Sequence, residues 1–372
     1  MQGKVDYSFI GKNIQIIRRR SGLTQVDLAK RIRIHQGPLS MIENGENIPS
    51  ARIIFEISKA LNVSSDALFA RNQSELHELI KKEQKNIYRI DLDNEKLTNQ
   101  TEATINVIMD YILALEDICN AQKHSLIPLT LPVEPTYAGI EKLVRRVRDI
   151  MGVRDAVIFD YFELFEVCGL RVIILPLFYR IFSASFYDSI NENAFFFINC
   201  KHNPEKQIFR LLYELGHLFL FMWERKVGHM KFFEIKGESL DIHHAASKFA
   251  ALFLMPEYAV QSTVSQLGIK KSQWDFDLLL RIKHRFGVSA ESFLYRLNEL
   301  DLIDSDLNAS LHDKILSFYK STNYKEPDSC RRILTPNGRI WDLVHTAKNN
   351  IDYKKEVHSI EEFFKKSNII KI

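Results

Sequence analysis

The sequence predicts an α+β protein: an all-α N-terminal part is followed by a mostly helical C-terminal part with a small β-sheet. Apolar residues within 1–70 recur at spacings that fit five short helices packed on one small core. Three runs between residues 170 and 200 are rich in β-branched and aromatic residues, as strands are. Helical patterns flank those runs on both sides.

Length and composition restrict the class of protein. The chain of 372 residues is long enough for two or three domains, and 46% hydrophobic with 26% charged residues is ordinary for a soluble globular protein. The longest apolar runs, such as "VIILPLF", are too short to span a bilayer, and the N-terminus has no apolar stretch of the signal-peptide type. We therefore expect a cytoplasmic protein with no membrane partner.

The four cysteines do not form a recognisable site. Cys119, Cys168, Cys200 and Cys330 lie far apart, with no CxxC pair. This distribution argues against a disulfide framework and against a cysteine zinc site.

The first helices carry clear start and stop signals. The first helix, about residues 10–20, is followed by Gly22, which suits the left-handed position after a helix end. Thr24 can cap the next helix, with Asp27 in its first turn. Pro38 suits the first turn of the third helix, which Gly45 ends. The expected core residues are Ile14, Leu28, Ile32, Leu39, Ile42, Ile53, Ile57 and Val63.

The second and third of these helices have the arrangement of a helix-turn-helix, in which the second helix lies in the DNA major groove. Gln36 opens that second helix, and a glutamine amide can pair with N6 and N7 of adenine. Gln25 opens the preceding helix, where it can donate to a phosphate. Residues 1–70 contain 10 Lys and Arg against 6 Asp and Glu, which is weak support for double-stranded DNA as the partner.

Residues 9–69 resemble the XRE (lambda-repressor/Cro-like) family almost from end to end, through "GLTQVDLA", "LSMIENGENIPS" and "ALNVSSDALF". His35 and Gly37 depart from the family's common Ser-Gln-Ser opening of the recognition helix, so the base preference does not transfer. The resemblance implies six DNA contacts: Gln25 to the backbone, Gln36, Gly37 and Ser40 to the bases, and Asn44 and Asn47 beyond the recognition helix.

Residues 71–135 are predicted to connect the first domain to the second. A charged helix is expected from 75 to about 123, with apolar residues at alternating three- and four-residue steps over two heptads. Such a helix either packs on its own domain or forms a dimer seam, and both alternatives stay open. "SLIPLTLPVEPT" (125–136), with three prolines, is predicted to be a linker or domain boundary.

The C-terminal domain is predicted to span residues 136–310, and residues 311–372 form an extension of unknown role. A helix from Gly139 precedes strands at 170–178, 182–188 and 193–200. Helices are expected at 203–222 and 240–254, with two more around Gly287.

"YELGH" (213–217) contains most of a zinc-protease signature. In H-E-x-x-H the two histidines lie four apart on one helical face and grip one zinc, and the Glu activates the zinc-bound water. Glu214, the general base of an active enzyme, and His217 are present, but Tyr213 replaces the first histidine. A phenol with a reference pKa of about 10 is a poor zinc donor at neutral pH.

Residues 139–303 resemble the ImmA/IrrE metallopeptidase family, whose fold is zincin-like, through "CGLRVIILPL", "FFFINCKHNPEKQIFRLLYELGHLFL" and "HHAASKFAALFLMP". The resemblance implies a third metal ligand, usually Glu, at the position of His243. In one alternative His217 and His243 hold a metal with Tyr213, and His244 or Asp241 fills a gap. In the other, both ligand positions drifted after catalysis was lost.

The leading hypothesis is a sequence-specific transcription regulator, a homodimer, whose peptidase-like domain is a pseudoenzyme that senses a small ligand or binds a peptide or protein. No cofactor is expected, and zinc only if the altered site still functions. The first alternative is an active zinc metallopeptidase that cleaves a repressor. The second is an antitoxin-like autorepressor.

Overall fold

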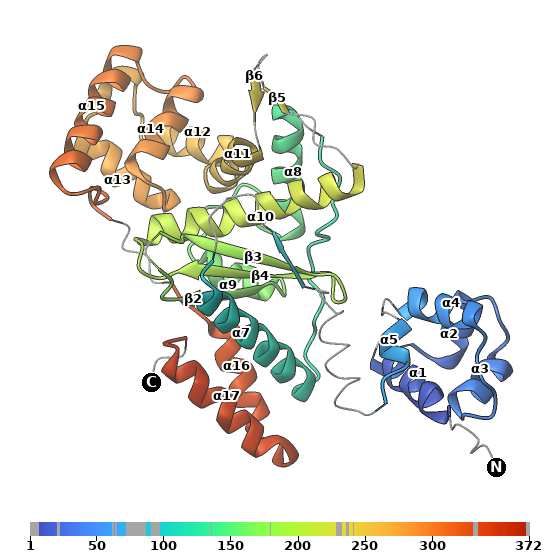
Figure 1. Cartoon of the computed structure of the whole chain (residues 1–372). Helices are drawn as coiled ribbons and strands as arrows, with labels where there is room; N and C mark the ends of the chain where they lie inside the picture. The colour runs from blue at the N-terminus through green and yellow to red at the C-terminus, as the bar shows by residue number, and fades with distance from the viewer. Residues whose placement is uncertain are drawn as a thin grey trace, which may run out of the picture. The chain divides into compact units, whose positions relative to one another are not determined.

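The computed structural model describes residues 7–20, 23–61, 63, 65–71, 87–90, 97–134, 136–178, 180–227, 233–235, 238–240, 242–329 and 334–369. The chain divides into two compact units, Met1–Ile87 and Tyr88–Ile372 (Figure 1), and each unit is described by itself. The α+β class predicted from the sequence is confirmed. None of the described helices is long and apolar enough to cross a membrane.

The N-terminal unit is helical, as predicted. The cap expected at Thr24 forms, because its hydroxyl accepts from the Asp27 N–H. The Asp27 carboxylate accepts from the Thr24 N–H in return, which completes a capping box. Gly45 has φ +76° directly after the third helix, whereas Gly22 lies outside the described residues. The described helices are α1 (Ser8–Arg20), α2 (Gln25–Arg31), α3 (Gln36–Glu43), α4 (Ala51–Leu61) and α5 (Ser65–Leu68).

The helices of this unit enclose one small apolar core. Of the eight core residues predicted, seven are buried and Ile53 packs on the core from a partly buried position. Its neighbour Ile54 takes the inner position. The three- and four-residue apolar spacing therefore identified the core correctly, within one residue.

The second unit is built around a sheet with strand order β1-β3-β4-β2. The central strand β4 pairs antiparallel with β3 and parallel with β2. The three predicted strands are confirmed. The strands are β1 (Ile87–Ile90), β2 (Arg171–Leu175), β3 (Ser183–Asp188) and β4 (Asn193–Asn199).

The helix predicted from residue 75 is wrong at 87–90, where the chain forms β1. Residues 72–86 and 91–96 of that prediction lie outside the described part of the chain. The segment Ile-Tyr-Arg-Ile has high β-propensity, and β3 offers it a sheet edge. A tertiary contact thus decides the local conformation.

Helix α10 (Pro204–Val227) runs along one side of the sheet and packs on α11 (Ile242–Leu254), which in turn contacts α8 (Tyr137–Ile150) (Figure 1). A short hairpin, β5 (Phe233–Ile235) and β6 (Glu238–Leu240), joins α10 to α11. The remaining helices of this region are α9 (Tyr161–Val167), α12 (Glu257–Gln266), α13 (Phe276–Phe286), α14 (Ala290–Glu299) and α15 (Ser305–Ser321).

Three helices from the two ends of this unit pack together: α7 (Asn99–Ile118), α16 (Gly338–Ala347) and α17 (Lys354–Lys366). The heptad residues Ile105, Ile108 and Leu115 of α7 are fully buried within the chain. The helix therefore packs on its own domain, and its apolar face does not form an exposed dimer seam. Part of the predicted extension 311–372 belongs to the same packed unit.

The proline-containing segment 125–136 is not a linker. Ile127, Leu129, Leu131 and Val133 are buried in the main core of the second unit. The prolines interrupt regular structure, but every second side chain is apolar and faces inward. The prediction of a domain boundary there was wrong, because the chain divides at residues 87–88.

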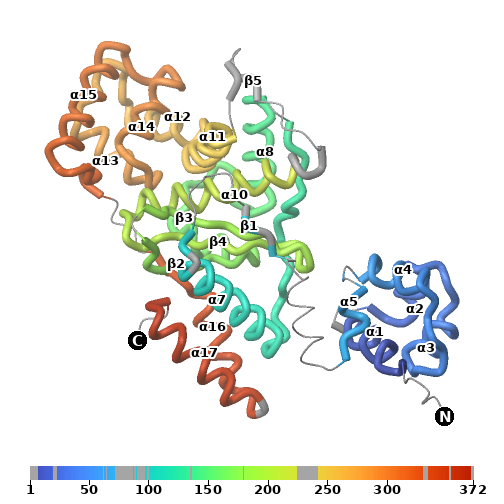
Figure 2. Tube along the Cα trace, in the orientation of Figure 1, coloured from blue at the N-terminus to red at the C-terminus, as the bar shows by residue number. Residues whose placement is uncertain are grey.

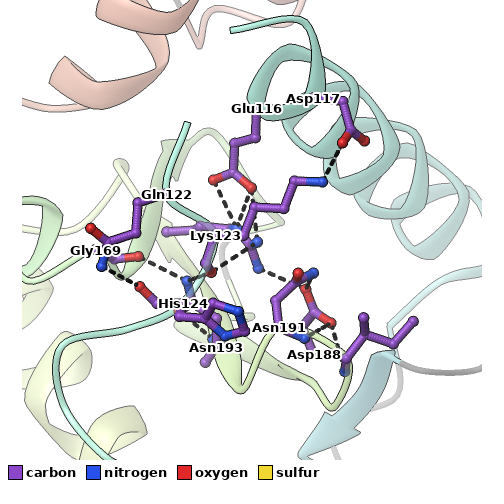
Figure 3. Close-up of polar contacts among 12 residues, drawn as sticks. Glu116, Asp117, Gln122, Lys123, His124, Gly169, Asp188, Asn191 and Asn193 are labelled. Carbon is purple, nitrogen blue, oxygen red and sulfur yellow. Dashed lines mark hydrogen bonds and ion pairs between the residues drawn. The ribbon is translucent and has the colours of Figure 1, made fainter. Parts of the chain in front are cut away.

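A buried ionic cluster fastens α7 to the sheet (Figure 3). The Arg171 guanidinium donates to both oxygens of Glu116 and, at 2.9 Å, to Asp188. All three side chains are at most 2% exposed. Arg339 of α16 also donates to Glu116, at 3.2 Å. This arginine–carboxylate cluster links α7, β2, β3 and α16. Because its charges are buried, removal of one side chain leaves the opposite charge uncompensated.

Candidate functional site

The recognition helix α3 presents most of the predicted DNA contacts to solvent. It begins at Gln36, directly after the extended N-cap His35. Gln36, Gly37, Asn44 and Asn47 are exposed. Gln25 and Ser40 are partly exposed, so the structure places all six predicted residues on the surface of the N-terminal unit.

A hydrogen-bonded chain holds the two glutamines in place. Gln36 donates to the Gln25 side chain at 3.0 Å, and Gln25 donates to Glu43 at 2.9 Å. The buried Glu43 carboxylate is neutralised by Arg18, at 2.6 Å. The fold thereby orients the first residue of each of these two helices.

Gly37 and the two asparagines differ in how the fold constrains them. A Cβ at Gly37 would meet no atom within 4 Å, so the fold does not require glycine there. The Asn44 amide donates weakly to Glu46 at 3.4 Å, and that of Asn47 to the Met41 sulfur at 3.7 Å. These long contacts fix neither amide firmly in one orientation.

The second candidate site lies between α10 and α11. Tyr213, Glu214 and His217 lie on α10, and His243 lies in the first turn of the facing helix α11. A Cβ at Gly216 would lie 2.8–2.9 Å from three Phe249 side-chain atoms. Glycine at this spacer position of "YELGH" therefore allows the two helices to approach closely enough for their polar residues to meet.

The two altered ligand positions are bonded to each other. The Tyr213 hydroxyl lies 2.7 Å from Nδ1 of His243. The ring centroid of His217 lies 5.5 Å from that of Tyr213 and 5.9 Å from that of His243. The structure thus brings together all three residues that the sequence placed at the metal site, and it joins two of them by a hydrogen bond across the helix pair.

The carboxylate of Glu214 is hydrogen-bonded by two serines of β3. Ser183 donates to one carboxylate oxygen at 2.6 Å, and Ser185 donates to the other. Glu214 is 6% exposed. A carboxylate in a dry site that accepts from two hydroxyls is held in a fixed orientation and is less available to take a proton from water.

His217 is buried and neutral. Burial, with His243 and Arg210 nearby, lowers its pKa to about 3. It is 2% exposed, and neither ring nitrogen has a hydrogen-bond partner among the described residues. A buried imidazole without hydrogen-bond partners lowers the stability of the fold. Packing alone therefore does not explain the histidine at this position.

The donor set does not fit a zinc ion of the family type. The Tyr213 hydroxyl and Nδ1 of His243, which stand at two of the three ligand positions, are hydrogen-bonded to each other. His244 is exposed, and Asp241 lies outside the described residues. Within the described parts of the chain, no group of three His, Cys, Asp or Glu residues is placed to hold a metal.

Sequence reasoning missed five residues that shape these sites. Ser183 and Ser185 could be found from the two-residue period of a strand, which turns both toward one face. Arg210, one turn before Tyr213, places its guanidinium 4.9 Å from that ring. Arg18 and Glu43 are 25 residues apart, and no spacing rule pairs them.

Comparisons with known proteins match the segments that carry the two candidate sites. A family model described as Helix-turn-helix matches residues 14–68, and one described as IrrE N-terminal-like domain matches residues 166–298. An uncharacterized HTH-type transcriptional regulator of Bacillus subtilis (strain 168), YazB, is 40% identical over 58 residues, 16% of this chain and 84% of that protein. One from Archaeoglobus fulgidus is 30% identical over 63 residues, 17% of this chain and 90% of its own length.

Two solved structures pair with nearly the whole chain at low similarity. Bacillus thuringiensis PlcR in complex with the peptide PapR7 and DNA is 14% identical, with a TM-score of 0.16, over 95% of this chain and 97% of that one. The apo competence regulator ComR from Streptococcus vestibularis is 12% identical, with a TM-score of 0.17, over 99% and 94%. Such TM-scores give no support for a shared overall fold.

Proposed function

Since the chain belongs to the XRE-type helix-turn-helix transcription regulators and carries an IrrE-like peptidase domain, we propose that this second domain binds a partner and hydrolyses no peptide bond. The protein is a DNA-binding transcription regulator. A DNA target places it in the cytoplasm, and a paired operator would require a homodimer. The polar residues between α10 and α11 then contribute to binding the partner or to maintaining the shape of the domain.

The Tyr213–His243 hydrogen bond is the observation that carries the proposal. In an H-E-x-x-H peptidase the two positions hold zinc, whereas here the phenol and the imidazole satisfy each other at 2.7 Å. Without the metal, the carboxylate of Glu214 has no activated water to deprotonate. The same bond joins α10 to α11, as a shared metal would, so the domain keeps its shape without zinc.

Metal content and hydrolysis test the proposal together. We would measure zinc per chain, and cleavage of a fluorescent casein, for the native protein and for Tyr213→His, His243→Glu and the double variant. The native chain should bind no zinc and cleave nothing, while the double variant should bind close to one zinc. His217→Ala in the double background is the control and should release it. Zinc bound by the native chain, or cleavage by it, would overturn the proposal.

For DNA we propose that Gln25 contacts the backbone, that Gln36, Gly37 and Ser40 face the bases, and that Asn44 and Asn47 contact phosphates. An operator would first be selected from random duplexes with the native protein. Gln36→Ala should then cost about 1–3 kcal/mol on that operator and relax the preference at one base pair. Asn47→Ala should weaken all duplexes alike. Equal effects of both substitutions on selected and random DNA would contradict these roles.

A further inference from the structure

Two positive charges share one aromatic ring near the start of α10. The Lys206 ammonium lies 4.0 Å from the centre of the Phe182 ring, and the central carbon of the Arg210 guanidinium lies 4.6 Å from it. The two charges are therefore less than about 9 Å apart, a distance at which physiological salt only partly screens them. We call Phe182, Lys206 and Arg210 the basic patch.

The basic patch does not arise from helix stability. Lys206 and Arg210 are four residues apart on α10, and like charges at that spacing destabilise a helix. Partial burial and the neighbouring Arg210 charge lower the pKa of Lys206. The face of the Phe182 ring attracts a cation but carries no net negative charge. The pair therefore retains an electrostatic repulsion that a negatively charged ligand would relieve.

The carboxylates nearest to the basic patch along α10 are bonded to other groups. Glu205, next to Lys206, lies 3.5 Å from the buried ammonium of Lys283. Glu214, one turn after Arg210, accepts from two serines of β3. Among the described residues, neither the Lys206 ammonium nor the Arg210 guanidinium forms an ion pair or a hydrogen bond. The part of the chain that the structure describes thus supplies no counter-charge.

The basic patch is accessible and adjoins the site between α10 and α11. Lys206 is exposed, and Phe182 and Arg210 are partly exposed. Phe182 directly precedes β3, which packs on α10 (Figure 2). The Arg210 guanidinium also lies 4.9 Å from the Tyr213 ring. An anionic group bound by the basic patch therefore lies beside Tyr213, at one end of the polar site.

We propose that the basic patch binds an acidic side chain of the partner protein, with Arg210 donating to the carboxylate and Lys206 adding the second positive charge. The planar fork of a guanidinium matches a carboxylate in geometry. A DNA duplex requires a row of phosphate contacts, whereas two charges this close fit a single acidic group. The inference rests on the proposed function, in which the domain binds a partner, and it specifies the partner's chemistry.

The test uses the full chain and two fluorescein-labelled peptides, hexaglutamate and hexaglutamine, whose affinities are measured by fluorescence anisotropy at physiological ionic strength. Arg210→Gln and Lys206→Met each remove one charge of the basic patch, and Arg210→Lys keeps the charge but not the fork. Arg146→Gln, at an exposed arginine of α8, makes the same charge change outside the basic patch and is the matched control.

We expect the native chain to bind hexaglutamate and not hexaglutamine. Arg210→Gln and Lys206→Met should each weaken hexaglutamate binding about tenfold, the loss of one charge-assisted contact, while Arg146→Gln binds like the native chain. Arg210→Lys should lose less affinity than Arg210→Gln. Because Lys206 is exposed, Lys206→Met tests the basic patch even if Arg210→Gln fails to fold. Equal affinities for the two peptides, or equal losses in Lys206→Met and Arg146→Gln, would overturn the inference.

A labelled random DNA duplex separates an acidic protein from a nucleic acid as the ligand. Its affinity should be the same for the native chain, Lys206→Met and Arg146→Gln. Weaker duplex binding by Lys206→Met alone, with hexaglutamate affinity unchanged, would assign the basic patch to nucleic acid and overturn the inference.

The same samples separate this inference from the proposed function. Zinc content and cleavage of the fluorescent casein are measured on each variant. Hexaglutamate affinity that does not depend on Lys206 or Arg210, in a chain that binds no zinc and cleaves nothing, overturns only the inference about the basic patch. Cleavage of casein by the native chain overturns the proposed function instead, whatever the peptide affinities.

Discussion

Two buried polar clusters in the second unit are built in opposite ways. In the arginine–carboxylate cluster, Nε and both terminal nitrogens of the Arg171 guanidinium each donate to a carboxylate of Glu116 or Asp188. In the site between α10 and α11, Tyr213 and His243 are paired, but the imidazole of His217 has no partner among the described residues.

The difference lies in how far the buried polar atoms of each cluster have hydrogen-bond partners. A buried polar group is retained for stability only when its bonds are satisfied, because an unsatisfied one costs about 1–3 kcal/mol. The side chains of Arg171, Glu116 and Asp188 meet this condition, whereas Nε of Arg339 is buried without a hydrogen-bond partner among the described residues. The cluster joins four elements. His217 does not meet it, so hydrogen bonding within the described residues does not explain why this position holds an imidazole.

The largest effect should come from removing Glu116. Glu116→Ala leaves Arg171 buried with one carboxylate in place of two, and should lower the free energy of unfolding by about 3–5 kcal/mol. Urea denaturation followed by tryptophan fluorescence reports the second unit alone, because Trp223, Trp274 and Trp341 all lie in it.

Asp117→Ala is the matched control for this prediction. Asp117 is the next residue on α7, its side chain is 68% exposed, and it pairs with Lys123. Its loss should cost less than about 1 kcal/mol. Equal losses in the free energy of unfolding of the two variants would show that burial does not determine how much the cluster contributes to stability.

Replacement of His217 should have the opposite sign. His217→Met fills a similar volume with an apolar side chain and removes two unpaired nitrogens, so it should raise the free energy of unfolding by about 1–3 kcal/mol. The same urea experiment measures it. A loss of similar size would mean that the imidazole has a bonded partner, and the contrast between the clusters would disappear.

The pH dependence of stability should differ between the native protein and His217→Met. The His217 pKa is lowered to about 3 in the folded chain from 6.5. Between these values the unfolded chain binds the extra proton, so stability falls as the pH drops below about 6.5, by roughly 1 kcal/mol per pH unit. His217→Met removes this slope.

The pH measurement needs the difference between the native protein and the variant. Glu166 has its pKa raised to about 7 by burial, which favours the folded state at low pH and gives a slope of opposite sign up to that value. This contribution is common to both proteins and cancels in the difference. Parallel stability curves from pH 4 to 6.5 would contradict a neutral, buried His217.

The smallest effect should come from breaking the hydrogen bond between Tyr213 and His243. Tyr213→Phe removes the hydroxyl that lies 2.7 Å from His243, and should cost about 0.5–1.5 kcal/mol. Tyr295→Phe, at a tyrosine that is 65% exposed, is the control and should cost nothing measurable. In a His243→Phe background the cost of Tyr213→Phe should vanish, since the partner is gone.

The two regions also differ in how far the sequence predicted them. Tyr213, Glu214 and His217 share one helix, and their spacing alone placed them together. His243 was assigned through a family resemblance, and the structure brings it to Tyr213. The arginine–carboxylate cluster was not predicted, because Glu116, Arg171 and Arg339 come from segments 55 and 168 residues apart along the chain.

By itself the sequence determined what depends on local order: the helix-turn-helix with its Thr24 cap, the apolar period of α7, the three strands, and the altered ligand motif on α10. These follow from propensities and spacings within one element. Tertiary structure decided the rest. It made a strand of residues 87–90, because β3 offered an edge, and it buried the proline-containing segment 125–136, because the core needed its alternate apolar side chains. Such outcomes depend on partners distant in the chain, and no local pattern records them.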